Sequence, residues 1–195
     1  EPLRAVDVGI ARTQPALPNH AEVREVEALN LAAVAAAVQA IYLENQYLAA
    51  RSLAEALAAR LREPDGPEIV IVLPRSSESR LEQQSMDSAR HRLLRLLWEA
   101  DAHGRLGVYF PVAAGGVPVY VHSKVMVIDE RLLRIGSSNL NNRSLGFDSE
   151  CDLALEAVPD TSGHATVASE IAYTRDDLWA EHLGISVELL RAEIA

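Results

Sequence analysis

Apolar residues along this chain follow two alternating patterns, short runs typical of strands and longer segments with helical periodicity. The short runs are rich in Val, Ile, Leu and Tyr, and Pro, Gly or charged residues often bound them. These features predict strands over residues 4–11, 40–47, 68–75, 105–111, 117–128, 132–136 and 150–157.

The longer segments place their apolar residues on one face of a helix. In residues 22–39, for example, Val26, Ala33 and Val34 share a face. The same pattern predicts helices over residues 22–39, 52–61, 81–102 and 166–183. A short last helix is expected after Ser186, which is a good N-cap and has Glu188 in the turn that follows.

The order of these elements indicates an α/β protein. Strands that alternate with helices in the first half predict βαβ crossovers, and the consecutive strands after Arg105 predict hairpins. We therefore expect a mixed β-sheet sandwiched between α-helices. No internal repeat, low-complexity segment or linker divides the sequence, so residues 1–195 are expected to form a single domain.

Charge and composition narrow the classes of function. A formal net charge of −10 disfavours nucleic acid as a partner and broad binding to an anionic membrane, but it leaves room for a local basic pocket. No apolar run approaches the roughly 18 residues of a membrane span. The only cysteine, Cys151, excludes an intramolecular disulfide. The chain begins at Glu1 without Met, so we expect a piece of a longer protein, soluble and either cytoplasmic or peripheral to a membrane.

A histidine and a lysine two positions apart, His122 and Lys124, are the first candidate site residues. On a strand they would point to the same side. An imidazole beside an ammonium suits attack on a phosphodiester, because one supplies a nucleophile or proton and the other holds a phosphate oxygen. Asp129 falls where Asp-Glu-Arg is typical of a hairpin turn, so we expect a structural role for it rather than contact with substrate.

The following strand would return Ser137 and Asn139 to one face, where both offer uncharged donors for phosphate oxygens. Gly136 would let the backbone pass closely beside them. Glu150, on the next strand, is a carboxylate of the kind that fixes the tautomer and orientation of a catalytic imidazole. We therefore expect His122, Lys124 and Asn139 to converge in one cleft and to share one phosphate.

Each of these residues has an ordinary structural explanation when taken alone. A single histidine on a strand is more often structural, a single lysine is usually solvated, and Gly-Ser-Ser-Asn is usually a loop. Their conjunction at fixed spacings instead favours phosphodiester chemistry. The remaining histidines show no metal-ligand spacing with one another or with Cys151, so the sequence predicts no metal site.

Residues 122–139 resemble the signature of the phospholipase D superfamily, HxK(x)4D(x)6GSxN, at every specified position. Glu150 stands where that family places a carboxylate after the motif. Residues 42–47, Tyr-Leu-Glu-Asn-Gln-Tyr, are similar to the strand before the second motif in the phospholipid-cleaving branch. Residues 178–184, Leu-Trp-Ala-Glu-His-Leu-Gly, are similar to the closing helix of bacterial members of that branch. The resemblance places Asn45 and Gln46 in the substrate pocket.

The resemblance implies a phospholipase D-like (HKD) fold and a two-step reaction on a phospholipid, either hydrolysis or transphosphatidylation, through a phosphohistidine and without a metal or other cofactor. The implied catalytic residues are His122, Lys124, Asn139 and Glu150, with Ser137 and Gly136 beside the phosphate. His122 would act as nucleophile or as general acid. Glu150 would orient the histidine of its own motif or that of a partner motif.

Members of this superfamily assemble two such motifs, within one chain or by homodimerisation, and this sequence carries one. It resembles the C-terminal half of a bacterial two-motif enzyme. We therefore expect an inactive monomer whose partner is a second HKD motif, from the N-terminal half of the same protein or from a second copy. The expected ligand is a phospholipid head group or another phosphodiester, with peripheral membrane contact. The alternatives are a cardiolipin synthase-type phosphatidyltransferase, a one-motif homodimeric nuclease or phosphodiesterase, and a non-catalytic interaction domain.

Overall fold

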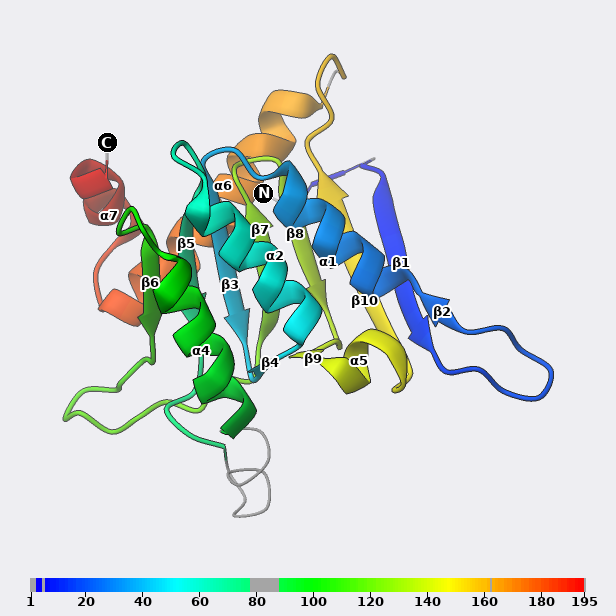
Figure 1. Ribbon diagram of the computed structural model, residues 1–195. Helices are drawn as coiled ribbons and strands as arrows, with labels where there is room; N and C mark the ends of the chain where they lie inside the picture. The colour runs from blue at the N-terminus through cyan, green and yellow to red at the C-terminus, as the bar shows by residue number, and fades with distance from the viewer. Residues whose placement is uncertain (1–2, 5, 78–87, 162, 195) are drawn as a thin grey trace.

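A single large sheet forms the centre of the molecule. The computed structural model describes residues 3–4, 6–77, 88–161 and 163–194. Eight strands are hydrogen-bonded in the order β2-β1-β10-β8-β7-β3-β5-β6 (Figure 1). Their bounds are β1 Val8–Gln14, β2 Val23–Arg24, β3 Ala40–Asn45, β5 Glu68–Val72, β6 Leu106–Tyr109, β7 Lys124–Ile128, β8 Leu132–Gly136 and β10 Glu150–Glu156. A separate two-stranded sheet pairs β4 (Leu48–Ala49) with β9 (Leu140–Asn141).

Helices lie on both sides of the large sheet. Figure 1 shows α1 (Glu25–Ala36), α2 (Arg51–Arg62) and α4 (Ser88–Ala100) in front of it, and α6 (His164–Leu183) behind it. The short α5 (Asn142–Gly146) follows β9, and α7 (Val187–Ile194) ends the described chain. This arrangement confirms the expected α/β fold with a mixed sheet between helices. Among the described residues, no helix is long and apolar enough to cross a membrane.

The alternation of side chains along β3 explains how one strand serves two cores. Ile41 and Leu43 belong to the larger core, which includes Leu53, Leu57 and Leu61 of α2. Tyr42 belongs to the smaller core beneath α6, with Ile171. β3 is buried on both faces, as a central strand of a sheet with helices on both sides must be.

Strand directions bring the two halves of the His122–Asn139 segment to one end of the sheet. β3, β5 and β6 are parallel, β7 is antiparallel to β3, and β8 is antiparallel to both β7 and β10. The end of β3 at Asn45 therefore lies beside the start of β7 at Lys124, the end of β8 at Gly136 and the start of β10 at Glu150. We call this the motif end of the sheet.

Several sequence-based expectations differ from the structure. The strand expected over residues 117–128 begins only at Lys124, so His122 precedes it. The hairpin expected between β6 and β7 is wrong, because β7 pairs with β3 and β6 lies at the edge beside β5. The first strand was predicted to begin at residue 4, whereas β1 begins four residues later, at Val8. Residues 81–87 of one expected helix lie outside the described residues, and the rest forms α4.

Candidate active site

Lys124 sits at the start of β7, beside Asn45 of β3 in the pairing register. Its Nζ donates a hydrogen bond to the carbonyl oxygen of His122 at 2.8 Å. Burial lowers the pKa of the Lys124 ammonium, and the negative charge of Glu150 opposes that shift. The exposed imidazole of His122 and a partly desolvated cation are thus adjacent at the motif end.

Ser137 and Glu150 are in direct contact at the same end. The Ser137 hydroxyl donates to a carboxylate oxygen of Glu150 and accepts a hydrogen bond from the backbone N–H of Cys151 at 3.1 Å. The backbone N–H of Ser137 donates to the carbonyl of Cys151 at 3.2 Å. Glu150 therefore fixes Ser137 and acts on Lys124 through its charge. That it orients a catalytic imidazole stays a prediction.

A buried charged cluster supports the loop that carries Ser137 and Asn139. Arg134 and Asp152 are fully buried, and their side chains pair at 2.5 Å. The Ser138 hydroxyl donates to Asp152 and accepts from Arg134 at 2.6 Å. The Ser138 backbone N–H also donates to Asp152 at 3.1 Å. Arg134 Nη1 and Asp152 thus both hold Ser138, the residue before Asn139, while Nε and Nη2 of Arg134 have no partner among the described residues.

Gly136 has a steric reason to be glycine. A Cβ atom at this position would lie 1.9 Å from Oδ1 of Asp152 and 2.5 Å from its Cα. Asp152 is opposite Gly136 in the pairing of β8 with β10. Any side chain at position 136 would therefore displace the carboxylate that holds Ser138. The predicted contact of Gly136 with a phosphate stays a prediction.

Asn139 is held from both sides by Asn45. The Asn45 side chain donates to the carbonyl of Ser138 at 3.4 Å and accepts from the backbone N–H of Leu140 at 3.1 Å. It also accepts from the N–H of Tyr47 at 3.1 Å and is fully buried. Asn45 thus positions the Asn139 loop, and its predicted contact with substrate stays a prediction. Oδ1 of Asn139 is itself buried without a hydrogen-bond partner in the described part of the chain.

The neighbours of Asn45 hold the segment around His122 instead. Gln46 donates to the hydroxyl of Tyr120 at 2.8 Å, two residues before His122. Glu44 accepts a hydrogen bond from Ser123, one residue after it, at 2.5 Å. Glu44 and Gln46 therefore contact the segment of His122, whereas Asn45 between them contacts the loop of Asn139. Gln46 was expected to bind substrate. Its side chain is half-buried and contacts Tyr120, and its contact with substrate stays a prediction.

The contact between Glu44 and His182 was not predicted from the sequence. The His182 imidazole lies 3.0 Å from Glu44, which also accepts a hydrogen bond from Tyr42 at 2.7 Å. Residues 42–47 and 178–184 were noted as separate stretches of resemblance. An acidic residue in one and a histidine in the other could have suggested a contact, although 138 positions separate them.

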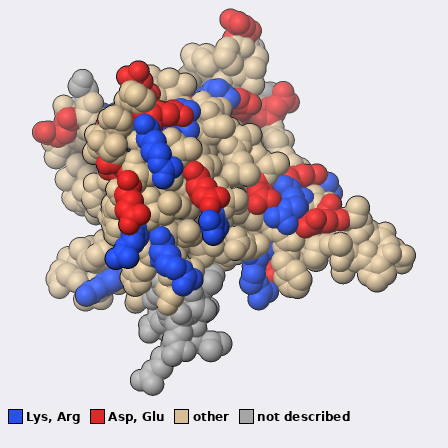
Figure 2. Space-filling model, in the orientation of Figure 1, with Lys and Arg blue, Asp and Glu red and all other residues tan. Residues whose placement is uncertain are grey.

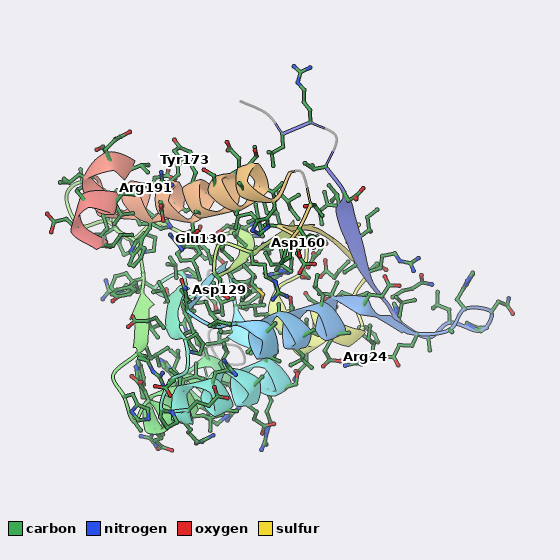
Figure 3. All side chains as sticks on the ribbon, turned by 90° about the horizontal axis from the view of Figure 1, so that it is seen from above. Arg24, Asp129, Glu130, Asp160, Tyr173 and Arg191 are labelled. Carbon is green, nitrogen blue, oxygen red and sulfur yellow. The ribbon has the colours of Figure 1, made fainter. Side chains whose placement is uncertain are left out.

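Asp129, labelled in Figure 3, directly follows Ile128 at the opposite end of β7 from Lys124. Its carboxylate accepts hydrogen bonds from the backbone N–H groups of Val38, Gln39 and Ala40 at 3.0, 2.7 and 2.8 Å. Its backbone has a φ of 55°, a left-handed conformation that Asp tolerates better than most residues. Asp129 therefore ties the turn after β7 to the start of β3, in agreement with its expected structural role.

Charged side chains of both signs are mixed on the face of the molecule that Figure 2 shows. Figure 2 shows acidic and basic side chains interspersed over the face covered by α1, α2 and α4, without a continuous basic surface. Among the residues with described positions, no three His, Cys, Asp or Glu side chains are grouped to hold a metal ion. Lys124 is a cation at the motif end, and Arg12 lies opposite Cys151 on the neighbouring strand β1.

Comparisons with known proteins find relatives of part of this chain. The family model described as phospholipase D matches residues 112–192. Phospholipase D zeta 2 of Arabidopsis thaliana is 40% identical over 91 residues, which cover 43% of this chain and 8% of that protein. Phospholipase D A of Dictyostelium discoideum is 40% identical over 75 residues, which cover 34% of this chain and 6% of that protein. The chain thus matches a small part of these curated relatives.

Solved structures extend the similarity to most of the chain. Nuc from Salmonella typhimurium, described as a phospholipase D family member, has a TM-score of 0.61 at 17% identity, covering 89% of this chain and 93% of that chain. Phosphatidylserine synthase from Haemophilus influenzae has a TM-score of 0.65 at 15% identity, covering 90% of this chain and 38% of that chain. These likenesses establish the fold. Both sequence relatives named above are eukaryotic, so bacterial origin stays a prediction.

Proposed function

Because this chain belongs to the phospholipase D superfamily, we propose that it supplies one of the two HKD motifs of a phospholipase D-type phosphodiesterase. The substrate class is a phospholipid, and the reaction is hydrolysis or transphosphatidylation. The observation that carries the proposal is the gathering of Lys124, Ser137 and Glu150 with the His122 segment at one end of the sheet. A desolvated ammonium beside an exposed imidazole is suited to a phosphate that is both bound and attacked.

The reaction needs two imidazoles, one on each side of phosphorus. One histidine forms an N–P bond as the P–O bond to the leaving alcohol breaks, and the other gives its proton to the departing oxygen. That second histidine then takes a proton from water or another alcohol, whose oxygen attacks phosphorus and breaks the N–P bond. His122 fills one of these roles and a histidine of the partner motif fills the other.

Lys124 and Asn139 would hold the non-bridging phosphate oxygens while negative charge builds on them. Such donors stabilise the transition state best when they are fixed in advance. The support for preorganisation lies in the hydrogen bonds around them. Asn45 brackets Asn139 through its neighbours Ser138 and Leu140, and Lys124 is tied to the backbone of His122.

An exposed apolar face supports the need for a partner. Ile10, Leu153 and Ile135 lie side by side across β1, β10 and β8, and they are 65%, 49% and 47% exposed. β8 and β10 also lead to Ser137 and Glu150 at the motif end. Contiguous exposed apolar surface marks interaction sites. We assign this face to the partner motif, whether that motif lies in the N-terminal half of the same protein or in a second copy.

A phosphatidyltransferase of the cardiolipin synthase type is the second candidate. A phosphatidylserine synthase shares the fold, and this chain covers 38% of that protein. The two candidates share the phosphohistidine and differ in the acceptor that resolves it. A net charge of −10 argues against the nuclease, because nucleic-acid affinity depends on neutralising phosphates.

The sequence provides a direct probe of the proposed phosphate site, because Lys124 is the only lysine in the chain. Incorporation of 13C-labelled lysine gives one set of side-chain signals, and their titration reports the pKa of Lys124. We expect a value below the ordinary 10.5, and we expect added inorganic phosphate or tungstate to raise it. His122→Asn and Asn139→Ala should weaken this response. An unaltered Lys124 titration at saturating anion would contradict the proposal.

A further inference from the structure

Glu44 is the meeting point of three side chains from different elements. It accepts hydrogen bonds from Ser123 at 2.5 Å, from Tyr42 at 2.7 Å and from His182 at 3.0 Å. The Glu44 residue is 5% exposed. An ionised carboxylate accepts several donors at once, and burial strengthens each of these interactions. Glu44 therefore links the closing helix α6 to the segment that carries His122.

Ser123 is the residue between His122 and Lys124. Ser123 directly precedes β7, which begins at Lys124. Its hydroxyl is fixed by Glu44 on the α6 side of the sheet. Fixing the middle residue of a three-residue segment also fixes the directions of the residues on either side of it.

We propose that Glu44 and His182 form a positioning pair that holds Ser123, and through it sets the directions of His122 and Lys124. Neither residue of the pair touches the phosphate; both act through Ser123. The consequence for catalysis rests on the proposed function, whereas the mechanical link between His182 and His122 does not.

The contact with Glu44 changes the pKa of His182. The hydrogen bond to Glu44 is the largest influence and raises the pKa of His182 above 6.5, against the effect of burial. Burial would raise the pKa of Glu44, but hydrogen bonds from His182, Ser123 and Tyr42 outweigh it and lower that pKa below 4.5. Both shifts favour the ionised form, the imidazolium of His182 and the carboxylate of Glu44.

The groups around His182 come from three elements. Glu44 and Tyr42 face it from β3, and Glu181 adds a weaker attraction from α6 itself. On its other side lies a cavity of about 300 Å³ whose lining includes Tyr109 of β6 and Trp179. His182 itself lines this cavity, and its side chain is partly exposed, whereas that of Glu44 is buried.

The test follows both imidazoles by NMR as pH rises. We expect the signal of His122 to show a second inflection at the pH where His182 titrates, because loss of charge on His182 loosens the hold on Ser123. Ser123→Ala should remove that inflection while His182 still titrates. Glu181→Gln is the matched control, since it removes a nearby carboxylate that does not contact Ser123, and the inflection should remain.

The kinetic arm uses the complete two-motif enzyme. Glu44→Gln and His182→Asn should lower kcat for phosphodiester cleavage on the order of 10- to 100-fold with a smaller change in KM, because reacting groups are misdirected rather than removed. If His122 shows the second inflection but the enzyme cleaves no phosphodiester, the link between His182 and His122 is supported and the proposed function is refuted. An active enzyme whose kcat is unchanged by Glu44→Gln, with no inflection at His122, would overturn the positioning pair.

Discussion

Gly136 and Asp129 are specified positions of the motif, and the structure gives each of them a supporting contact. Gly136 leaves space for Asp152, whose carboxylate fixes Ser138 beside Asn139. Asp129 joins two backbone segments at the far end of β7. A residue can therefore be essential to this motif without approaching the phosphate.

The space at Gly136 leads to a stability prediction. Gly136→Ala places a Cβ atom 1.9 Å from the Asp152 carboxylate, so we expect a loss of about 1–3 kcal/mol in the free energy of unfolding. Gly9→Ala is the matched control on the same sheet, because its Cβ would make ordinary contacts at 3.6 and 3.7 Å. Urea denaturation measures both. Equal stability of the two variants would show that Asp152 can move without cost.

Asp129 provides a second test at the residue scale. Asp129→Ala leaves the N–H groups of Val38, Gln39 and Ala40 without their acceptor, which should cost about 1–3 kcal/mol. The response of the Lys124 signal to phosphate should stay as in the unchanged protein, because Asp129 is at the other end of β7. A folded variant that no longer responds to phosphate would mean that Asp129 contributes to the site after all.

At the scale of elements, the end of β3 organises the site. Glu44 and Gln46 hold the His122 segment, and Asn45 holds the Asn139 loop. α6 closes this arrangement through His182. α7 is fastened to α6 in turn, since Arg191 pairs with the buried Asp176 at 2.7 Å and its guanidinium lies 5.6 Å from the ring centroid of Tyr173 (Figure 3).

The docking of α6 should make stability depend on pH. The folded pKa of His182 is raised, so the stability it contributes is fully present below pH 6.5 and is lost as pH rises through the raised value. The folded pKa of Glu44 is lowered, so its contribution is present above pH 4.5 and is lost as pH falls through the lowered value. The free energy of unfolding should therefore fall on the alkaline side of pH 6.5. In His182→Asn this alkaline fall should shrink, and an unchanged slope would refute the assignment.

Local patterns predicted much of this architecture, and non-local pairings explain what they missed. The strand Leu132–Gly136 was predicted with its observed bounds, because Asp-Glu-Arg and the Gly-Ser pair punctuate it clearly. The two-residue strands β2, β4 and β9 carry too few residues for a period to appear. β7 pairs with β3, a strand far away in the sequence, and a pairing of this kind leaves no pattern in the local sequence. The chemistry of the motif was visible in sequence, whereas its support by Glu44, His182 and Asp152 required the fold.

At the scale of the whole molecule, the proposed function assigns a partner both to the site and to an exposed apolar face. The motif contributes a single histidine at its open end, and the reaction assigned to it uses two. Ile10, Leu153 and Ile135 lie exposed on strands that lead to that end. A homodimer would bring two copies of His122 together about a twofold axis, and an N-terminal half of the same protein would do so about a pseudo-twofold axis.

The most direct measurement is turnover as a function of assembly. Hydrolysis of bis-p-nitrophenyl phosphate and of phosphatidylcholine is measured while light scattering reports the mass of the species present, with His122→Ala as the control. We predict that the monomer is at least about a hundredfold less active per chain than the two-motif assembly, since it lacks either the nucleophile or the general acid. Robust turnover by a proven monomer, abolished by His122→Ala, would contradict the account, because it would show that one motif is sufficient.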